Sequence, residues 1–378
     1  METVKLTIEK AVYGGYGLGR SDGKVIFVPC TLPGDCVETT ITAVKKDFSY
    51  GTLLRIITPS KERTAPDCPN FAVCGGCDYL HCSYETELRI KKSIVVDSLL
   101  RTARLKPEDL PEIAVMASAR YGYRSHATVK RGGDGTAGFF RRDSTVHVPF
   151  PEKGCLLLSP VLIEALRKKE EAAVNEFRIA HDHEGAVYRS DCTGGPLREI
   201  EQGIIYDRDI SCFFQANRLL RSHMLAAAGE YGSAAEGVDF IDLACGVGFF
   251  ALYLGALGAE GTGVDIDRKN IRWALHNGKI NRAGPVGFVR ADIARVSFAG
   301  KNPGLIIADP PRAGLSLKTR SLITHLGPGL FVYVSCDPAT FSRDLRHFLE
   351  NGYRLARLAL LDMFPGTYHI ELMARLER

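Results

Sequence analysis

The sequence predicts an α/β protein in which a doubly wound, mainly parallel sheet follows a small β-barrel and a mixed central region. From residue 206 onward, short apolar β-former runs alternate with helical intervals. The first 62 residues instead show the period-two alternation of short strands, and a cysteine-rich segment follows them. Because 378 residues exceed one ordinary core, two or three domains are expected.

Composition limits the class of protein. A net charge of +4 permits a nucleic-acid partner without requiring one. No run approaches the roughly 20 apolar residues of a membrane span, so no membrane association is expected. Eleven cysteines in a chain that shows no export signal indicate a cytoplasmic protein, where clustered cysteines bind metal or perform chemistry more often than they form disulfides. The sequence implies no obligate protein partner.

Residues 1–62 are predicted to form the barrel. Alternating runs begin near Val4, Lys24 and Cys36, and glycine-rich turns separate them. About five short strands in this length are typical of an oligonucleotide-binding barrel. A phosphate-binding loop at residues 14–19 is the alternative, but no helix follows these glycines.

Residues 63–205 form the predicted central region. It begins with the cysteine-rich segment and continues into a helix at about 86–104, which has one apolar face. Further along, arginines adjoin aromatic residues at Arg124 and at Phe139–Arg141, as on a surface that stacks RNA bases. The alternative is that these aromatic residues face a core.

Residues 206–378 carry the alternating pattern. Strands are predicted at 238–243, 260–265, 286–290, 304–308 and 330–334. Ligands of such a sheet lie beyond the carboxyl ends of its strands. The residues predicted to contact a nucleotide-like cofactor at these ends are Asp242, Gly246, Gly248, Asp265 and Asp292. Phenylalanines interrupt the dinucleotide pattern after the second glycine, which favours S-adenosylmethionine over a dinucleotide.

Two later strand ends carry candidate chemistry. Asp309 precedes two prolines and Arg312, and a carboxylate fixed in this way is suited to hydrogen-bond a planar substrate. Cys336 follows the last predicted strand, in a polar loop. A thiolate there could add to carbon-6 of a uracil and thereby activate carbon-5. The alternative is an inert packing cysteine.

Three segments together resemble the RNA uridine carbon-5 methyltransferases, most closely the branch that modifies 23S ribosomal RNA. The segments are residues 309–314, residues 335–340 and residues 361–371. The resemblance extends over nearly the whole chain. It implies a Rossmann-like S-adenosylmethionine-dependent methyltransferase domain at 206–378, a TRAM domain at 1–62 and an iron–sulfur domain within 63–205.

The resemblance also implies roles for individual residues. Cys336 is the implied nucleophile, and Glu371 is the implied base that removes the carbon-5 proton. Asp309 is implied to contact both cofactor and uracil, and Gln215 to bind the cofactor. Asp265 and Asp292 match the ribose and adenine positions. Ala244 and Phe249 depart from the residues of many relatives, so cofactor contacts there are not predicted.

The four cluster ligands implied by the resemblance are Cys68, Cys74, Cys77 and Cys155, which would hold a 4Fe-4S cluster. A zinc site is the alternative, for which His81 and Cys82 are further candidate ligands.

The sequence therefore predicts methylation of one uridine in RNA, with 23S ribosomal RNA favoured as the partner. A transfer-RNA uridine methyltransferase is the nearest alternative. Cytosine methylation is disfavoured, because no cysteine lies in the loop after Asp309. An inactive RNA-binding or assembly factor is the alternative from another class.

Overall fold

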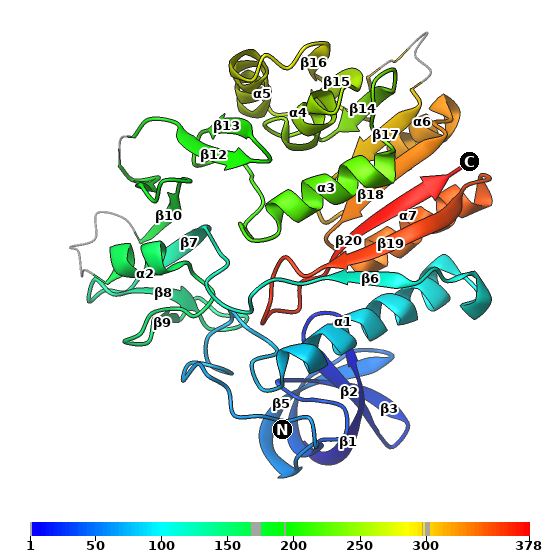
Figure 1. The fold of residues 1–378 in the computed structure, drawn as a ribbon. Helices are drawn as coiled ribbons and strands as arrows, with labels where there is room; N and C mark the ends of the chain where they lie inside the picture. The colour runs from blue at the N-terminus through cyan, green and yellow to red at the C-terminus, as the bar shows by residue number, and fades with distance from the viewer. Residues whose placement is uncertain (1, 168–174, 193, 297, 299–302) are drawn as a thin grey trace.

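A computed structural model describes residues 2–167, 175–192, 194–296, 298 and 303–378 (Figure 1). The amino-terminal region is a closed five-stranded barrel in the order β1-β2-β3-β5-β4, which confirms the predicted barrel. Alternation along its strands places Leu6, Ile8 and Val28 in the barrel core. The strands are β1 (Thr3–Val12), β2 (Tyr16–Ser21), β3 (Lys24–Pro29), β4 (Cys36–Val44) and β5 (Phe48–Thr58).

The glycines between the first two strands form a turn. Gly14 and Gly15 both have positive φ angles, +97° and +78°, which a residue with a side chain rarely adopts. The next residue, Tyr16, already begins β2. The segment is therefore a hairpin turn of the barrel, and the phosphate-loop alternative is wrong.

The central region contains a five-stranded sheet in the order β11-β10-β7-β8-β9. Its strands are β7 (His126–Arg131), β8 (Ala137–Phe140), β9 (His147–Pro149), β10 (Glu176–His181) and β11 (Val187–Arg189), with helix α2 (Pro160–Leu166) beside them. A separate hairpin follows, made of β12 (Leu197–Glu201) and β13 (Ile204–Arg208). The boundary placed at residues 205/206 falls inside this second strand.

An eight-stranded sheet in the order β16-β15-β14-β17-β18-β20-β19-β6 dominates the rest of the molecule. Its strands are β14 (Asp239–Leu243), β15 (Glu260–Asp265), β16 (Val286–Arg290), β17 (Leu305–Ala308), β18 (Leu330–Ser335), β19 (Arg354–Leu361), β20 (Glu371–Glu377) and β6 (Ile113–Met116). The first five match the predicted strands closely and run parallel, whereas β20 runs antiparallel to both its neighbours. The strand order reverses between β14 and β17, and that crevice is where such a sheet binds ligands.

Helices cover both faces of this sheet. Successive side chains of a strand point to opposite faces, so Ile307 belongs to one core and Ile306 to the other. The first core contains α3 (Arg221–Gly232), α4 (Phe249–Ala256) and α5 (Arg268–Ile280). The second contains α6 (Leu317–Leu326), α7 (Pro338–Glu350) and, from the central region, α1 (Tyr84–Ser98).

The helix predicted at 86–104 is confirmed, although it begins two residues earlier. Ser83 caps α1 by accepting a hydrogen bond from the backbone N–H of Thr86, and a π-helical turn (Leu99–Ala103) continues the helix. Short helical turns also occur at Pro107–Asp109. Figure 1 shows α1 lying between the barrel and the large sheet, alongside β6 and β19. The central region therefore completes the large sheet and its core.

Candidate active site

A sharp turn after β14 forms one wall of the crevice. Ala244, Gly246 and Gly248 all have positive φ angles, and α4 begins directly after the turn. The backbone N–H of Gly246 donates to Oδ2 of Asp265 at 2.9 Å. A Cβ atom added at Gly246 would meet no atom within 4 Å, so space lies beside this residue. The structure thus brings together the predicted glycine turn and the acidic residue at the end of β15.

Asp242 lies beneath this turn and is fully buried. Its Oδ2 accepts a hydrogen bond from the backbone N–H of Ala251 at 3.0 Å, which ties β14 to α4. The other carboxylate oxygen has no hydrogen-bond partner among the described residues. Burial raises the pKa of Asp242 to about 8. Asp242 therefore supports the turn through one oxygen, and its predicted contact with the cofactor stays a prediction.

Asp292 follows β16 and is partly exposed. Its Oδ1 accepts a hydrogen bond from the backbone N–H of Ala294 at 2.9 Å, and its Oδ2 pairs with Arg295 at 3.4 Å. The backbone N–H of the preceding residue, Ala291, donates to the carbonyl oxygen of Asp265 at 3.0 Å. The two predicted acidic positions therefore lie on one continuous rim.

Asp309 follows β17, across the reversal of strand order from the glycine turn. The side-chain amide of Gln215 donates to Oδ2 of Asp309 at 3.0 Å, so the structure brings these two predicted residues into contact. Burial raises the pKa of Asp309 to about 7, and the Gln215 amide acts in the opposite direction. A carboxylate fixed by one amide at this position can orient a polar ligand.

Cys336 and Glu371 share this part of the crevice. Cys336 follows β18 and is partly exposed, whereas Glu371 begins β20 and is 4% exposed. Burial, then the negative charges of Glu371 and Asp309, raise the pKa of Cys336 to about 12, and Arg312 lowers it. Burial also raises the pKa of Glu371 well above its usual range. The surroundings of Cys336 and Glu371 therefore disfavour the accumulation of negative charge.

Arg312 is held beside these groups by the segment that precedes Glu371. Its guanidinium contacts Nδ1 of His369 at 2.6 Å and donates to the hydroxyl of Tyr368 at 3.2 Å. The rings of Tyr368 and His369 lie 4.3 Å apart. We did not predict roles for these two rings, although both lie in the segment around Glu371 that carried the resemblance.

Tyr13 brings the barrel into the site. Its hydroxyl donates to the carbonyl oxygen of Cys336 at 3.2 Å, and its ring packs edge-on against Tyr368 at 5.4 Å. Tyr13 follows β1, 323 residues away from Cys336 along the chain. No local sequence pattern indicates a contact over such a separation.

The two departures from the resemblance have structural consequences. Phe249 is 7% exposed, and its ring packs against those of Tyr206 and Phe214 in the core. Ala244 adopts a positive φ angle of +66° within the sharp turn. Phe249 therefore serves packing in the core.

The residues of the predicted RNA-stacking surface lie in different surroundings. Phe139 packs edge-on against Phe150 at 4.9 Å and lines a cavity that also contains cysteine side chains. The ring of Phe139 therefore forms a wall of that cavity, and a contact of Phe139 with RNA stays a prediction. Arg141 is exposed, and Arg124 is partly exposed and lies near His369, whose pKa it lowers. RNA contacts by these two arginines remain predictions.

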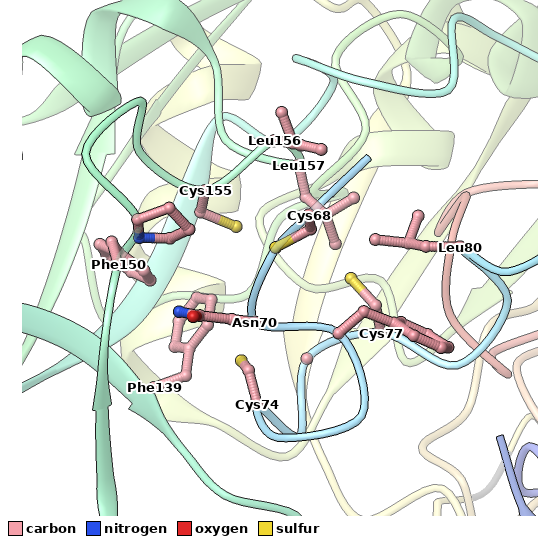
Figure 2. Close-up of a pocket in the computed structure, with 13 residues that line it drawn as sticks. Cys68, Asn70, Cys74, Cys77, Leu80, Phe139, Phe150, Cys155, Leu156 and Leu157 are labelled. Atoms are coloured by element: carbon pink, nitrogen blue, oxygen red, sulfur yellow. The ribbon is translucent and has the colours of Figure 1, made fainter. Parts of the chain in front are cut away.

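The four predicted cluster cysteines surround that cavity, which Figure 2 shows. Cys68, Cys74 and Cys77 lie on one loop, and Cys155 reaches the same space from the opposite side. Apolar side chains form most of the remaining wall: Phe71, Leu80, Phe139, Phe150, Leu156 and Leu157.

Within the described ranges, no group of three or more His, Cys, Asp or Glu residues is close enough to hold a single metal ion. This finding supports neither the zinc alternative nor the predicted 4Fe-4S cluster. His81 stacks on Phe71 at 5.0 Å, and Cys82 donates to the carbonyl oxygen of Tyr79 at 3.2 Å. Neither lines the cavity.

The comparisons with known proteins agree with this site. Residues 291–378 match the family model described as tRNA (Uracil-5-)-methyltransferase, residues 1–54 match the TRAM domain, and residues 241–308 match a methyltransferase domain. A relative from Aquifex aeolicus, named as an uncharacterized RNA methyltransferase, is 32% identical over 99% of this chain and 98% of its own.

A second relative is the 23S rRNA (uracil(1939)-C(5))-methyltransferase RlmD of Vibrio cholerae. It is 30% identical and covers 98% of this chain and 94% of its own. Among solved structures, the Pyrococcus abyssi tRNA (uracil-54, C5)-methyltransferase in complex with S-adenosyl-L-homocysteine matches with a TM-score of 0.76. It is 24% identical and covers 99% of this chain and 100% of its own, and it confirms the fold.

The chain belongs to the family of RNA uracil-5-methyltransferases with a TRAM domain. It is an S-adenosylmethionine-dependent enzyme whose substrate is RNA. In the part of the chain that the structure describes, no helix is long and apolar enough to span a membrane.

Proposed function

We propose that this enzyme methylates carbon-5 of a uridine in 23S ribosomal RNA, with Cys336 as nucleophile and Glu371 as base. The observation that carries the proposal is the convergence of Cys336, Glu371 and Asp309 in one crevice, where their charges affect one another. The crevice lies at the carboxyl ends of the strands, which is where the substrate S-adenosylmethionine would bind in this fold.

The reaction begins when the Cys336 thiolate attacks carbon-6 of the uracil. A carbon–sulfur bond forms, and the electron pair of the 5,6 double bond moves to carbon-5 and the O4 carbonyl. Carbon-5 then takes the methyl group from the sulfonium, which leaves neutral S-adenosylhomocysteine. Glu371 removes the proton from carbon-5, the double bond re-forms, and the thiolate is expelled. The bonds formed and broken balance without any redox partner.

Charge explains how the thiolate arises in this crevice. In the absence of substrates, burial and two carboxylates hold the pKa of Cys336 near 12. The sulfonium of S-adenosylmethionine would add a positive charge to that of Arg312, and a nearby positive charge favours ionised thiol and carboxyl groups. Cys336 is therefore expected to ionise, with its proton passing to solvent, when the methyl donor is bound.

The target uracil also has to be accessible to Cys336. A uracil within a helix presents no free face at carbon-6, so the target must be unstacked or flipped into the crevice. In the proposal, Arg124, Arg141 and the barrel bind the RNA that adjoins the target uridine.

The favoured substrate is ribosomal RNA because the RlmD relative aligns over nearly the full length of both chains. Mass-spectrometric mapping of 5-methyluridine in ribosomal and transfer RNA, with and without the gene, tests this assignment. We expect loss of one 23S modification, restored by the wild-type gene and not by Cys336→Ala. Loss of 5-methyluridine from transfer RNA alone would contradict ribosomal RNA as the substrate. Restoration of the modification by Cys336→Ala would contradict the role of Cys336 as nucleophile or indicate a noncatalytic role.

We also propose that Cys68, Cys74, Cys77 and Cys155 hold a 4Fe-4S cluster. Thiolates are the usual ligands of such clusters, and each cysteine binds a different iron, so the four sulfurs need not converge on one ion. The largely apolar cavity that the four residues line fits this group. Its proposed role is to order the central region, since the methyl transfer requires no electron.

Anaerobic purification with analysis of iron and acid-labile sulfide tests the cluster. We expect about four of each per wild-type chain, and substantial loss of both in Cys155→Ser. Cys192→Ser, which changes an exposed cysteine away from the cavity, is the matched control. Absence of iron from the wild-type protein, or equal iron in Cys155→Ser, would contradict the proposal.

A further inference from the structure

Asp78 stands where three regions of the chain meet. It lies in the cysteine-rich loop and is 2% exposed. Its Oδ1 pairs with Arg142 of the central region, and its Oδ2 accepts a hydrogen bond from the backbone N–H of Tyr368 at 2.8 Å. A Cβ atom added at Gly15 of the barrel turn would come within 2.5 Å of the carboxylate.

The loop around Asp78 is bonded to the segment before Glu371 at further points. The backbone N–H groups of Asp78 and Tyr79 both donate to the carbonyl oxygen of Gly366, at 2.8 and 3.1 Å. The N–H of Gly366 in turn donates to Glu87 of α1 at 2.6 Å. Together with the bond to Tyr368, these contacts fix the path of the chain from Gly366 to Tyr368.

That path determines where Arg312 lies. The Tyr368 hydroxyl accepts a hydrogen bond from Arg312, whose guanidinium also lies over the Tyr368 ring, 5.7 Å from its centre. Arg312 is the positive group that acts on both Cys336 and Glu371. A continuous series of contacts therefore runs from Asp78 through Tyr368 and Arg312 to the reacting groups.

We infer that Asp78 is a positioning residue for the methyl transfer: through the backbone of Tyr368 it holds Arg312 beside Cys336 and Glu371. The inference rests on the proposed roles of Cys336 and Glu371. Asp78 does not touch the reacting atoms. It also forms an ion pair with Arg142. The test must therefore separate positioning from the stability that a buried ion pair provides.

The first measurement is the rate at which iodoacetamide alkylates Cys336 in the purified full chain without RNA, followed by peptide mass spectrometry at pH 8. Asp78→Ala should slow this alkylation by about threefold or more, because a displaced Arg312 no longer favours the thiolate. Asp78→Asn retains an acceptor for the Tyr368 N–H and should restore most of the wild-type rate.

Asp35→Ala is the matched control, since Asp35 of the barrel is also buried and is paired with Arg63. It should lower stability without changing Cys336 alkylation. Equal alkylation in wild-type and Asp78→Ala protein would overturn the inference. Should Asp78→Ala fail to fold, Tyr368→Phe tests the next contact: slower alkylation supports the inference and an unchanged rate contradicts it.

Single-turnover methyl transfer gives the second readout. Asp78→Ala should lower the rate by about tenfold to a hundredfold, with S-adenosylmethionine affinity within about twofold of wild type. An inactive wild-type enzyme would contradict the proposed function, whereas the alkylation result concerns Asp78 alone. An active wild type with an equally fast Asp78→Ala variant would overturn the inference and leave the proposed function standing.

Discussion

Asp309 illustrates a conflict between stability and chemistry at the scale of one residue. Its carboxyl group lies near Asp242, Cys336 and Glu371 and receives a hydrogen bond from Gln215. Burial raises its pKa to about 7, so the folded protein retains a proton that the unfolded chain releases near pH 4. The contribution of this group to the free energy of unfolding therefore decreases as pH rises from about 4 to 7.

Asp309→Asn should consequently be more stable than wild type at pH 8, where the wild-type carboxylate is charged, and the advantage should shrink at pH 5. We expect an increase in Tm of about 2–4 °C at pH 8, measured by circular dichroism at both pH values. Asp22→Asn, at an exposed turn of the barrel, is the control and should change neither value. An Asp309→Asn protein that melts at or below the wild-type temperature at pH 8 would contradict the conclusion that the charged Asp309 carboxylate destabilises the fold.

The structure brings together several of the residues predicted from the sequence to share a site. The glycine turn and Asp265 lie together, as do Gln215 and Asp309. The surroundings of Asp242 and Phe139 could not be predicted for one shared reason: a strand pattern does not specify which neighbour covers a side chain. Asp242 is covered by the start of α4, and Phe139 by the cysteine cavity.

At the scale of elements, α1 carries a buried ionic group that anchors the segment before Glu371. Nζ of Lys91 lies 2.8 Å from Glu87 and 2.6 Å from Asp362, and all three side chains are essentially unexposed. Lys91 also donates to the carbonyl oxygen of Phe364 at 3.2 Å. The apolar periodicity that predicts this helix does not reveal the group, because Asp362, which follows β19, is distant in sequence.

Lys91→Met should leave two buried carboxylates without their shared cation and reduce the free energy of unfolding by about 3–5 kcal/mol. Chemical denaturation, followed by tryptophan fluorescence and circular dichroism, measures the change. The adjacent, partly exposed Lys92 is the matched control, and Lys92→Met should cost about 1 kcal/mol or less. Equal losses in the two variants would show that the ionic group does not stabilise the helix.

At the scale of the whole molecule, the crevice is assembled from the barrel, the central region and the large sheet. Tyr13 reaches Cys336 from the barrel, Asp78 supports Tyr368 from the cysteine-rich loop, and β6 extends the sheet beside β19. The five parallel strands were predictable because buried strands form uninterrupted apolar runs. Contacts between regions distant in sequence were not predictable, since they depend on how the folded domains pack against one another.

The central claim is that Cys336 attacks the uracil and Glu371 completes the reaction. Glu371→Gln, incubated with ribosomal RNA and S-adenosylmethionine, tests it most directly, because methyl transfer can occur while removal of the carbon-5 proton cannot. We predict a protein–RNA adduct that survives denaturation, with a methylated uridine attached to the peptide containing Cys336. The absence of an adduct, or attachment at another cysteine, would contradict the account.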